Sequence, residues 1–149
     1  MLEIYKNSYV TLEEAGEYFS EKLDADFWKG LDDSKKEKAL ITASRRIDMQ
    51  PFLGRKAHPE QAMSFPRIIR GKKYEILYRI KAAVCEQVFE MFSNNFTANS
   101  NVKSVSLGSA SITFSDSADF ELCPESKLLL SGLLKTGFDI ENSYYEEKY

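Results

Sequence analysis

The order of apolar and polar residues predicts several helices separated by one long polar segment. Residues 11–14, Thr-Leu-Glu-Glu, form a capping box, and the apolar residues after it recur at helical spacing over about 12–23. A short turn follows at about 24–28, and a second helix is expected over about 34–48, after aspartates that can cap it. The densest apolar run predicts a long helix over about 73–93, ended by an asparagine-rich stretch. Pro124 then opens a last helix over about 124–135.

A different pattern, strict alternation of apolar and polar residues, appears in the sequence VSLGSASITF, residues 105–114. Glycine at the first central position of a two-residue turn suits a type II′ hairpin, so Gly108 predicts a β-hairpin over about 102–115. Its apolar face would carry Val105, Leu107, Ile112 and Phe114. A lone hairpin is marginally stable in water, so this face is expected to pack on the helices or on a neighbouring chain.

Together these elements predict a mainly α fold, a four- to five-helix bundle with one β-hairpin. The chain of 149 residues, 43% of them hydrophobic, fits a single domain over 1–140 with a flexible tail at 141–149. The segment at about 49–70 contains three prolines and is expected to be a loop. A connection of this length is usually functional or is ordered by packing.

Charge is distributed unevenly along the chain. The net charge is -3, which argues against a protein whose whole surface binds nucleic acid. Residues 45–81, however, hold 10 Lys and Arg against 3 Asp and Glu, a net charge of +7 between two acidic flanks. This basic middle includes Arg55, Lys56, Arg70, Lys72 and Lys73. It could face DNA, or it could face the acidic part of a neighbouring copy, and charge alone does not choose between these partners.

The residues that could carry chemistry predict neither a catalytic nor a metal site. His58 is the only histidine, the two cysteines are far apart in sequence, and no phosphate-binding loop has the required spacing. A hydrolase using His58 has little support. No cofactor or metal is expected, and the protein is not expected to be an enzyme. The aromatic residues of the basic middle, Phe52, Phe65, Tyr74 and Tyr78, are expected to anchor the core rather than to stack on bases.

Two absences in the sequence predict a protein that stays in a cytoplasm or is packed into something assembled there. The first residues lack the basic start and apolar run of a signal peptide. No apolar stretch approaches the roughly 20 residues that span a bilayer.

One stretch, ALITASRRIDMQPFLGRKAHPEQAMSFPR, resembles a family of tailed-phage and prophage proteins labelled DnaT-like single-stranded-DNA-binding proteins. The beginning of the chain, YVTLEEAGEYFSEKL, also resembles the start of that family. More broadly, the family is similar to the head–tail connector (adaptor) proteins of long-tailed phages. The positions that match the motif include Arg45, Asp48, Phe52, Gly54, Pro59, Gln61, Phe65, Pro66 and Arg67.

The resemblance to connectors implies a structural virion protein and a scaffold role for the motif. Asp48 and Arg67 are expected to pair across the loop, Gly54 to supply a sharp turn, and two phenylalanines to pin the loop to the helices. The protein would form a ring of about a dozen copies beneath the portal. It would contact the portal and the next neck or tail protein, and double-stranded DNA would pass through its lumen. It would be assembled in the bacterial host cytoplasm and reside in the virion neck. The five basic residues would face the lumen or the next subunit.

The family label supports a second hypothesis, a single-stranded-DNA-binding module in phage or prophage replication. This hypothesis predicts strongly salt-dependent affinity, because the protein would neutralise phosphates of the DNA backbone.

Overall fold

The computed structural model describes residues 1–105 and 122–135, and for residues 94–105 it describes the backbone only. Four α-helices are present in these ranges: α1 (Leu12–Ser20), α2 (Asp33–Asp48), α3 (Tyr78–Val105) and α5 (Pro124–Leu130). A 3₁₀ helix, η1 (Asp26–Gly30), lies between the first two. Three short strands, β1 (Arg55–Lys56), β2 (Arg67–Ile69) and β3 (Lys72–Tyr74), form one antiparallel sheet in the order β1-β2-β3. No helix in the described ranges is long and apolar enough to cross a membrane.

The helices begin where their sequences supply partners for unpaired backbone amides. At α1, the hydroxyl of Thr11 accepts from the amide of Glu14, and the carboxylate of Glu14 accepts from the amide of Thr11. At α2, the carboxylate of Asp32 accepts from the amide of Lys35 at 2.7 Å. At α5, proline occupies the first turn, where a missing N–H costs no hydrogen bond. The capping predicted from the sequence for α1 is therefore confirmed.

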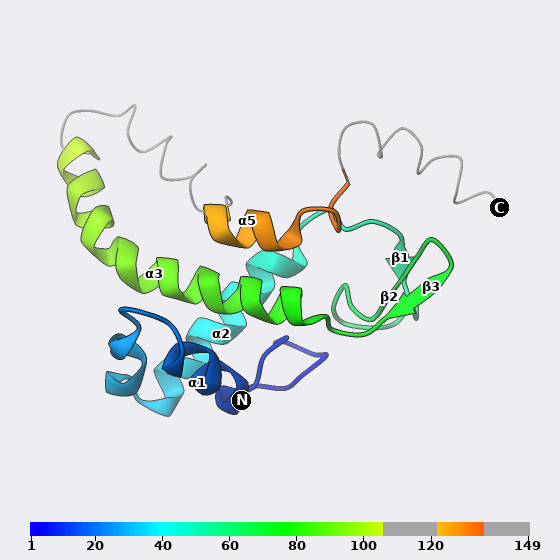
Figure 1. The fold of residues 1–149 in the computed structure, drawn as a ribbon, viewed down its shortest axis with the longest axis horizontal. Coiled ribbons are helices and arrows are strands. Elements are labelled where there is room, and N and C mark those ends of the chain that lie inside the picture. Colours follow the sequence, from blue (N-terminus) through cyan, green and yellow to red (C-terminus); the bar gives the residue numbers. More distant parts are fainter. Residues whose placement is uncertain (106–121, 136–149) are drawn as a thin grey trace.

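Helix α3 forms the centre of the molecule, with α5 packed on one side and α1 and α2 on the other (Figure 1). The first part of α3 is buried on nearly all sides, as its apolar sequence predicts, and includes Ile80, Val84 and Val88. Two ion pairs also join α1 and the residues after it to α3: Lys81 with Glu14, and Lys22 with Glu86. The sheet lies beside the beginning of α3 (Figure 1).

The segment after α5 fastens the loop that precedes the sheet. The amide of Leu53 donates to the carbonyl of Leu133 at 2.8 Å, and the amide of Lys135 donates to the carbonyl of Pro51 at 2.7 Å. Phe52 and Leu134 form an isolated antiparallel bridge between these bonds. Residues near the end of the described chain thus fix the start of the basic segment.

The fold differs from the expected helical bundle, because it is a mixed α and β structure. The segment predicted as a loop at about 49–70 contributes two strands, and residues 72–74 form the third, although the long helix was predicted to begin at about residue 73. That helix begins at Tyr78 and continues through the asparagine-rich stretch to Val105. The last helix is shorter than expected, since it ends at Leu130.

The expected hairpin at about 102–115 is tested only at its start. Residues 102–105 are helical, so Val105 ends α3 instead of beginning a strand. Leu107, Ile112 and Phe114 lie outside the described residues, as does the expected tail at 141–149.

Candidate nucleic-acid interface

Five exposed cations gather on the three-stranded sheet, and we call this surface the basic sheet. It carries Arg55, Lys56, Arg70, Lys72 and Lys73, all exposed. These residues stood out in the sequence by their charge alone. The structure brings them together because the chain folds back twice within 20 residues.

The register of the sheet aligns two of the cations on one face. Arg55 of β1 lies opposite Ile68 of β2, which lies opposite Lys73 of β3. Residues directly opposite in a sheet share a face, so the partly exposed Ile68 is flanked by a cation on each side. The adjacent residues on β2, Arg67 and Ile69, are buried and face the core. Polar and apolar contacts are therefore both available on the outer face.

A tight turn places a third cation at the tip of the sheet. Ile69 pairs with Lys72, which leaves Arg70 and Gly71 as a two-residue turn. Both turn residues have positive φ, 51° and 78°. This combination is characteristic of the type I′ turn that matches strand twist.

The buried guanidinium of Arg67 fixes the segments that precede β1 and β2. It donates to four backbone carbonyls: Leu53 at 2.9 Å, Gly54 at 2.8 Å, Phe52 at 3.3 Å and Ser64 at 3.4 Å. Burial lowers the pKa of Arg67, while the nearby Tyr9 and Asp48 oppose that shift. The side chain keeps its charge, because an arginine pKa lies far above neutrality. Arg67 thus organises the loop from inside and is unavailable to DNA.

Asp48 was expected to pair with Arg67, but no ion pair joins these two residues in the described part of the chain. Its carboxylate instead accepts from the hydroxyl of Tyr9 and from the amide of Ser64. The two charged residues therefore hold the same loop without an ion pair between them, and both bond to Ser64: Asp48 accepts from its amide, and Arg67 donates to its carbonyl. The charges of Asp48 and Arg67 still attract each other electrostatically, without a direct contact.

Phe52 and Phe65 lie in the core, with exposed fractions of 2% and 0%. Their rings meet edge to face with centroids 5.0 Å apart. Between them in sequence, Gly54 has φ 75° and sits against β2. A Cβ atom on Gly54 would lie 2.0 Å from the carbonyl oxygen of Ile68. Only glycine fits such a close backbone approach.

Other motif residues order the connection from β1 to β2. The side chain of Gln61 accepts from the amide of His58 and donates to the carbonyls of Met63 and Pro66. Pro59 is exposed, and Arg45 is exposed on α2. His58 is exposed, and no cluster of three metal-ligating side chains occurs in the described part of the chain. That the protein is not an enzyme stays a prediction.

Three tyrosines lie near the basic sheet, and one of them corrects the expectation for aromatics. Tyr74 belongs to β3 rather than to a helix but packs against the core as expected, whereas Tyr78, also expected in the core, is 73% exposed. Tyr5 is 46% exposed and donates its hydroxyl to Glu75, next to β3. Sequence reasoning missed Tyr5, because no local pattern connects it to a residue 70 positions away. Exposed aromatic rings beside cations are a common feature of single-strand binding surfaces.

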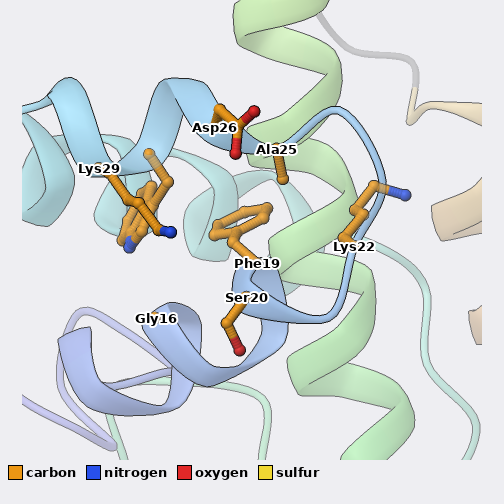
Figure 2. Close-up of a pocket in the computed structure, with 8 residues that line it drawn as sticks. Gly16, Phe19, Ser20, Lys22, Ala25, Asp26 and Lys29 are labelled. Carbon is orange, nitrogen blue, oxygen red and sulfur yellow. The ribbon is translucent and has the colours of Figure 1, made fainter.

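A small pocket elsewhere in the molecule does not compete with this surface. It lies between α1 and η1, and the ring of Phe19 stands at its centre (Figure 2). Its volume of about 60 Å³ is far below the roughly 300 Å³ at which small-molecule sites begin. The pocket has room for water molecules only.

A protein-family model described as "Putative DnaT-like ssDNA binding protein" matches residues 4–143. The chain belongs to this family. No curated protein and no solved structure showed a significant match. The match covers the described fold, including every residue of the basic sheet.

Membership in the DnaT-like family overturns the expectation of a head–tail connector. The family description names single-stranded DNA and neither a portal nor a virion neck. The portal, the neck or tail protein and double-stranded DNA in a lumen were therefore the wrong partners. The connector interpretation relied on the resemblance to connector proteins. The predicted hairpin and apolar helix agreed with it, but such features indicate a need for burial and do not identify what provides it.

Proposed function

We propose that this DnaT-like protein binds single-stranded DNA on the outer face of the basic sheet, as a module of phage or prophage replication. The observation that carries the proposal is the row Arg55–Ile68–Lys73, with Arg70 at the adjoining turn. We also propose that the protein acts in the host cytoplasm.

The cations would contact phosphates, and the binding would be largely independent of base sequence. Neighbouring strands lie about 4.8 Å apart, so Arg55 and Lys73 are two strand spacings, about 10 Å, from each other. A strand of DNA laid across the sheet could therefore meet both cations. Tyr5 and Tyr78 expose rings on which bases could stack, and stacking is tolerant of sequence because every base has a π face.

The test is the affinity for a fluorescent oligothymidine, measured by anisotropy over a salt series. The double variant Arg55→Gln/Lys73→Gln should bind more weakly, and the slope of log affinity against log salt should fall by about 1.4. Lys35→Gln/Lys38→Gln removes the same charge from exposed sites on α2 and is the matched control. Equal losses in both double variants would place the binding site elsewhere.

A further inference from the structure

The carboxylate of Glu75 is held by two groups, one from β3 and one from the N-terminal turn. The ammonium of Lys73 lies 3.3 Å from one carboxylate oxygen. The hydroxyl of Tyr5 donates to the other at 3.2 Å. Glu75 immediately follows β3, and its side chain is 59% exposed. It is the only acidic residue between positions 61 and 85. A lone negative charge thus sits at the edge of the basic sheet.

Tyr5 reaches Glu75 from an ordered N-terminal turn. Its φ of 68° is in the left-handed region, which a bulky residue seldom adopts. Its amide donates to the carbonyl of Ser8, and the side chain of Asn7 accepts from the amide of Glu3. Ser8 is fully buried and bonds to Ser44 of α2. The turn is therefore anchored in the core, and it presents the Tyr5 hydroxyl at a fixed place.

A carboxylate and a phosphate offer donors the same kind of forked pair of oxygens. A cation and a neutral hydroxyl that together bind a carboxylate can therefore also bind a phosphate. Exposed ion pairs such as Lys73 with Glu75 contribute little to stability, because water screens them. Separating Glu75 from Lys73 therefore requires little free energy when a DNA phosphate competes for the same donors.

We infer that Lys73 and Tyr5 form a phosphate subsite that Glu75 occupies in the free protein. This inference rests on the proposed single-stranded-DNA function. A phosphate of the bound strand displaces the carboxylate and takes both donors. Glu75 then acts as an internal competitor that lowers the affinity for DNA.

The test compares Glu75→Gln with the wild-type chain in oligothymidine binding over a salt series. Glutamine keeps an acceptor for Tyr5 and removes the charge that holds Lys73. We expect affinity to rise about two- to fivefold, the range that an exposed ion pair represents. The salt slope should steepen by about 0.7, because one more cation is free to release its counterion.

Two controls separate this effect from a general change in net charge. Glu60→Gln removes the same charge from the exposed β1–β2 connection, where Glu60 takes part in none of the ion pairs of the described residues. It should change affinity less than Glu75→Gln and leave the slope unaltered. In a Lys73→Gln background the gain from Glu75→Gln should disappear. Tyr5→Phe, which keeps the ring and removes the hydroxyl, should weaken binding.

The outcomes distinguish the inference from the proposed function. Wild-type binding with no gain in Glu75→Gln would overturn the subsite and leave the DNA-binding function intact. An equal gain in Glu60→Gln, or a gain that persists without Lys73, would also overturn it. No binding by either the wild-type chain or Glu75→Gln at low salt would overturn the proposed function itself. Binding by Glu75→Gln alone would support a subsite closed by its own carboxylate.

Discussion

Asp48 holds Ser64 at two points. The carboxylate of Asp48 accepts from the amide of Ser64 at 2.6 Å, and its backbone carbonyl accepts from the hydroxyl of Ser64 at 3.0 Å. A negative charge in the last turn of a helix is ordinarily unfavourable, because it faces the negative end of the helix dipole. Here that charge also accepts from the buried Tyr9, so it joins the N-terminal turn, α2 and the β1–β2 connection.

Asp48→Ala should therefore destabilise the protein by about 2–4 kcal/mol, because the buried donors of Tyr9 and Ser64 lose their acceptor. Asp48→Asn keeps a carbonyl oxygen for both donors and is the matched control, with an expected loss less than half as large. Urea unfolding at neutral pH measures both. An unchanged midpoint in Asp48→Ala would show that the loop is held without this residue.

Replacing two glycines of the sheet region by alanine tests the close approach of Gly54 to Ile68 of β2. Gly54→Ala should cost more than about 2 kcal/mol, since its Cβ would overlap the carbonyl of Ile68 at a positive φ. Gly71→Ala adopts a similar φ of 78° with nothing within 4 Å. It should cost only about 1 kcal/mol, the price of the backbone conformation. Equal shifts in melting temperature for the two variants would contradict the packing at Gly54.

Glu14 should make stability depend on acid pH. Burial acts to raise the pKa of its carboxyl, but the hydrogen bond from Lys81 and those at Thr11 oppose this and lower the pKa overall, below 4.5. A group with a lowered folded pKa stabilises the native state above its unfolded pKa. That contribution is lost as pH falls through the folded value.

Glu14→Gln should reduce the free energy of unfolding at pH 7 by less than about 1 kcal/mol, because the pair with Lys81 is about one-third exposed. Glutamine also preserves the capping box, so the change isolates the charge. The difference from the wild-type chain should vanish at pH values below the folded pKa. A deficit that persists there in urea unfolding would mean that Glu14 acts through packing alone.

Tyr78 should contribute to DNA binding without contributing to stability. Stacking on one base is worth about 1–3 kcal/mol, so Tyr78→Ala should weaken oligothymidine binding about fivefold or more. Its ring is 73% exposed, and the melting temperature should stay nearly constant. Leu128→Ala, an equally exposed side chain on α5, is the control and should leave affinity unchanged. A loss of melting temperature in Tyr78→Ala would assign the ring to packing.

Local patterns identified the beginnings of α1, α2 and α5, placed that of α3 too early, and missed the sheet. Thr11 and Pro124 act within a few residues of their own positions, so a sequence shows them directly. Strands of two or three residues are too short to display alternation. Helix α3 continues through residues 94–105 although asparagine is a poor helix former. That stretch contains no glycine or proline, and the remaining differences in propensity are small.

The sequence by itself determined that the chain has a basic middle, capped helices and no pattern of catalytic or metal-binding residues. It also indicated Gly54, Phe52, Phe65 and Arg67 as members of one ordered segment. Only the tertiary structure decided that the cations share one sheet, that Tyr5 meets Glu75, and that Asp48 and Arg67 both bond to Ser64 instead of pairing with each other. The physical reason is the range of the interactions. Capping depends on neighbours along the chain, whereas strand pairing and buried hydrogen bonds depend on residues that meet only after the core has formed.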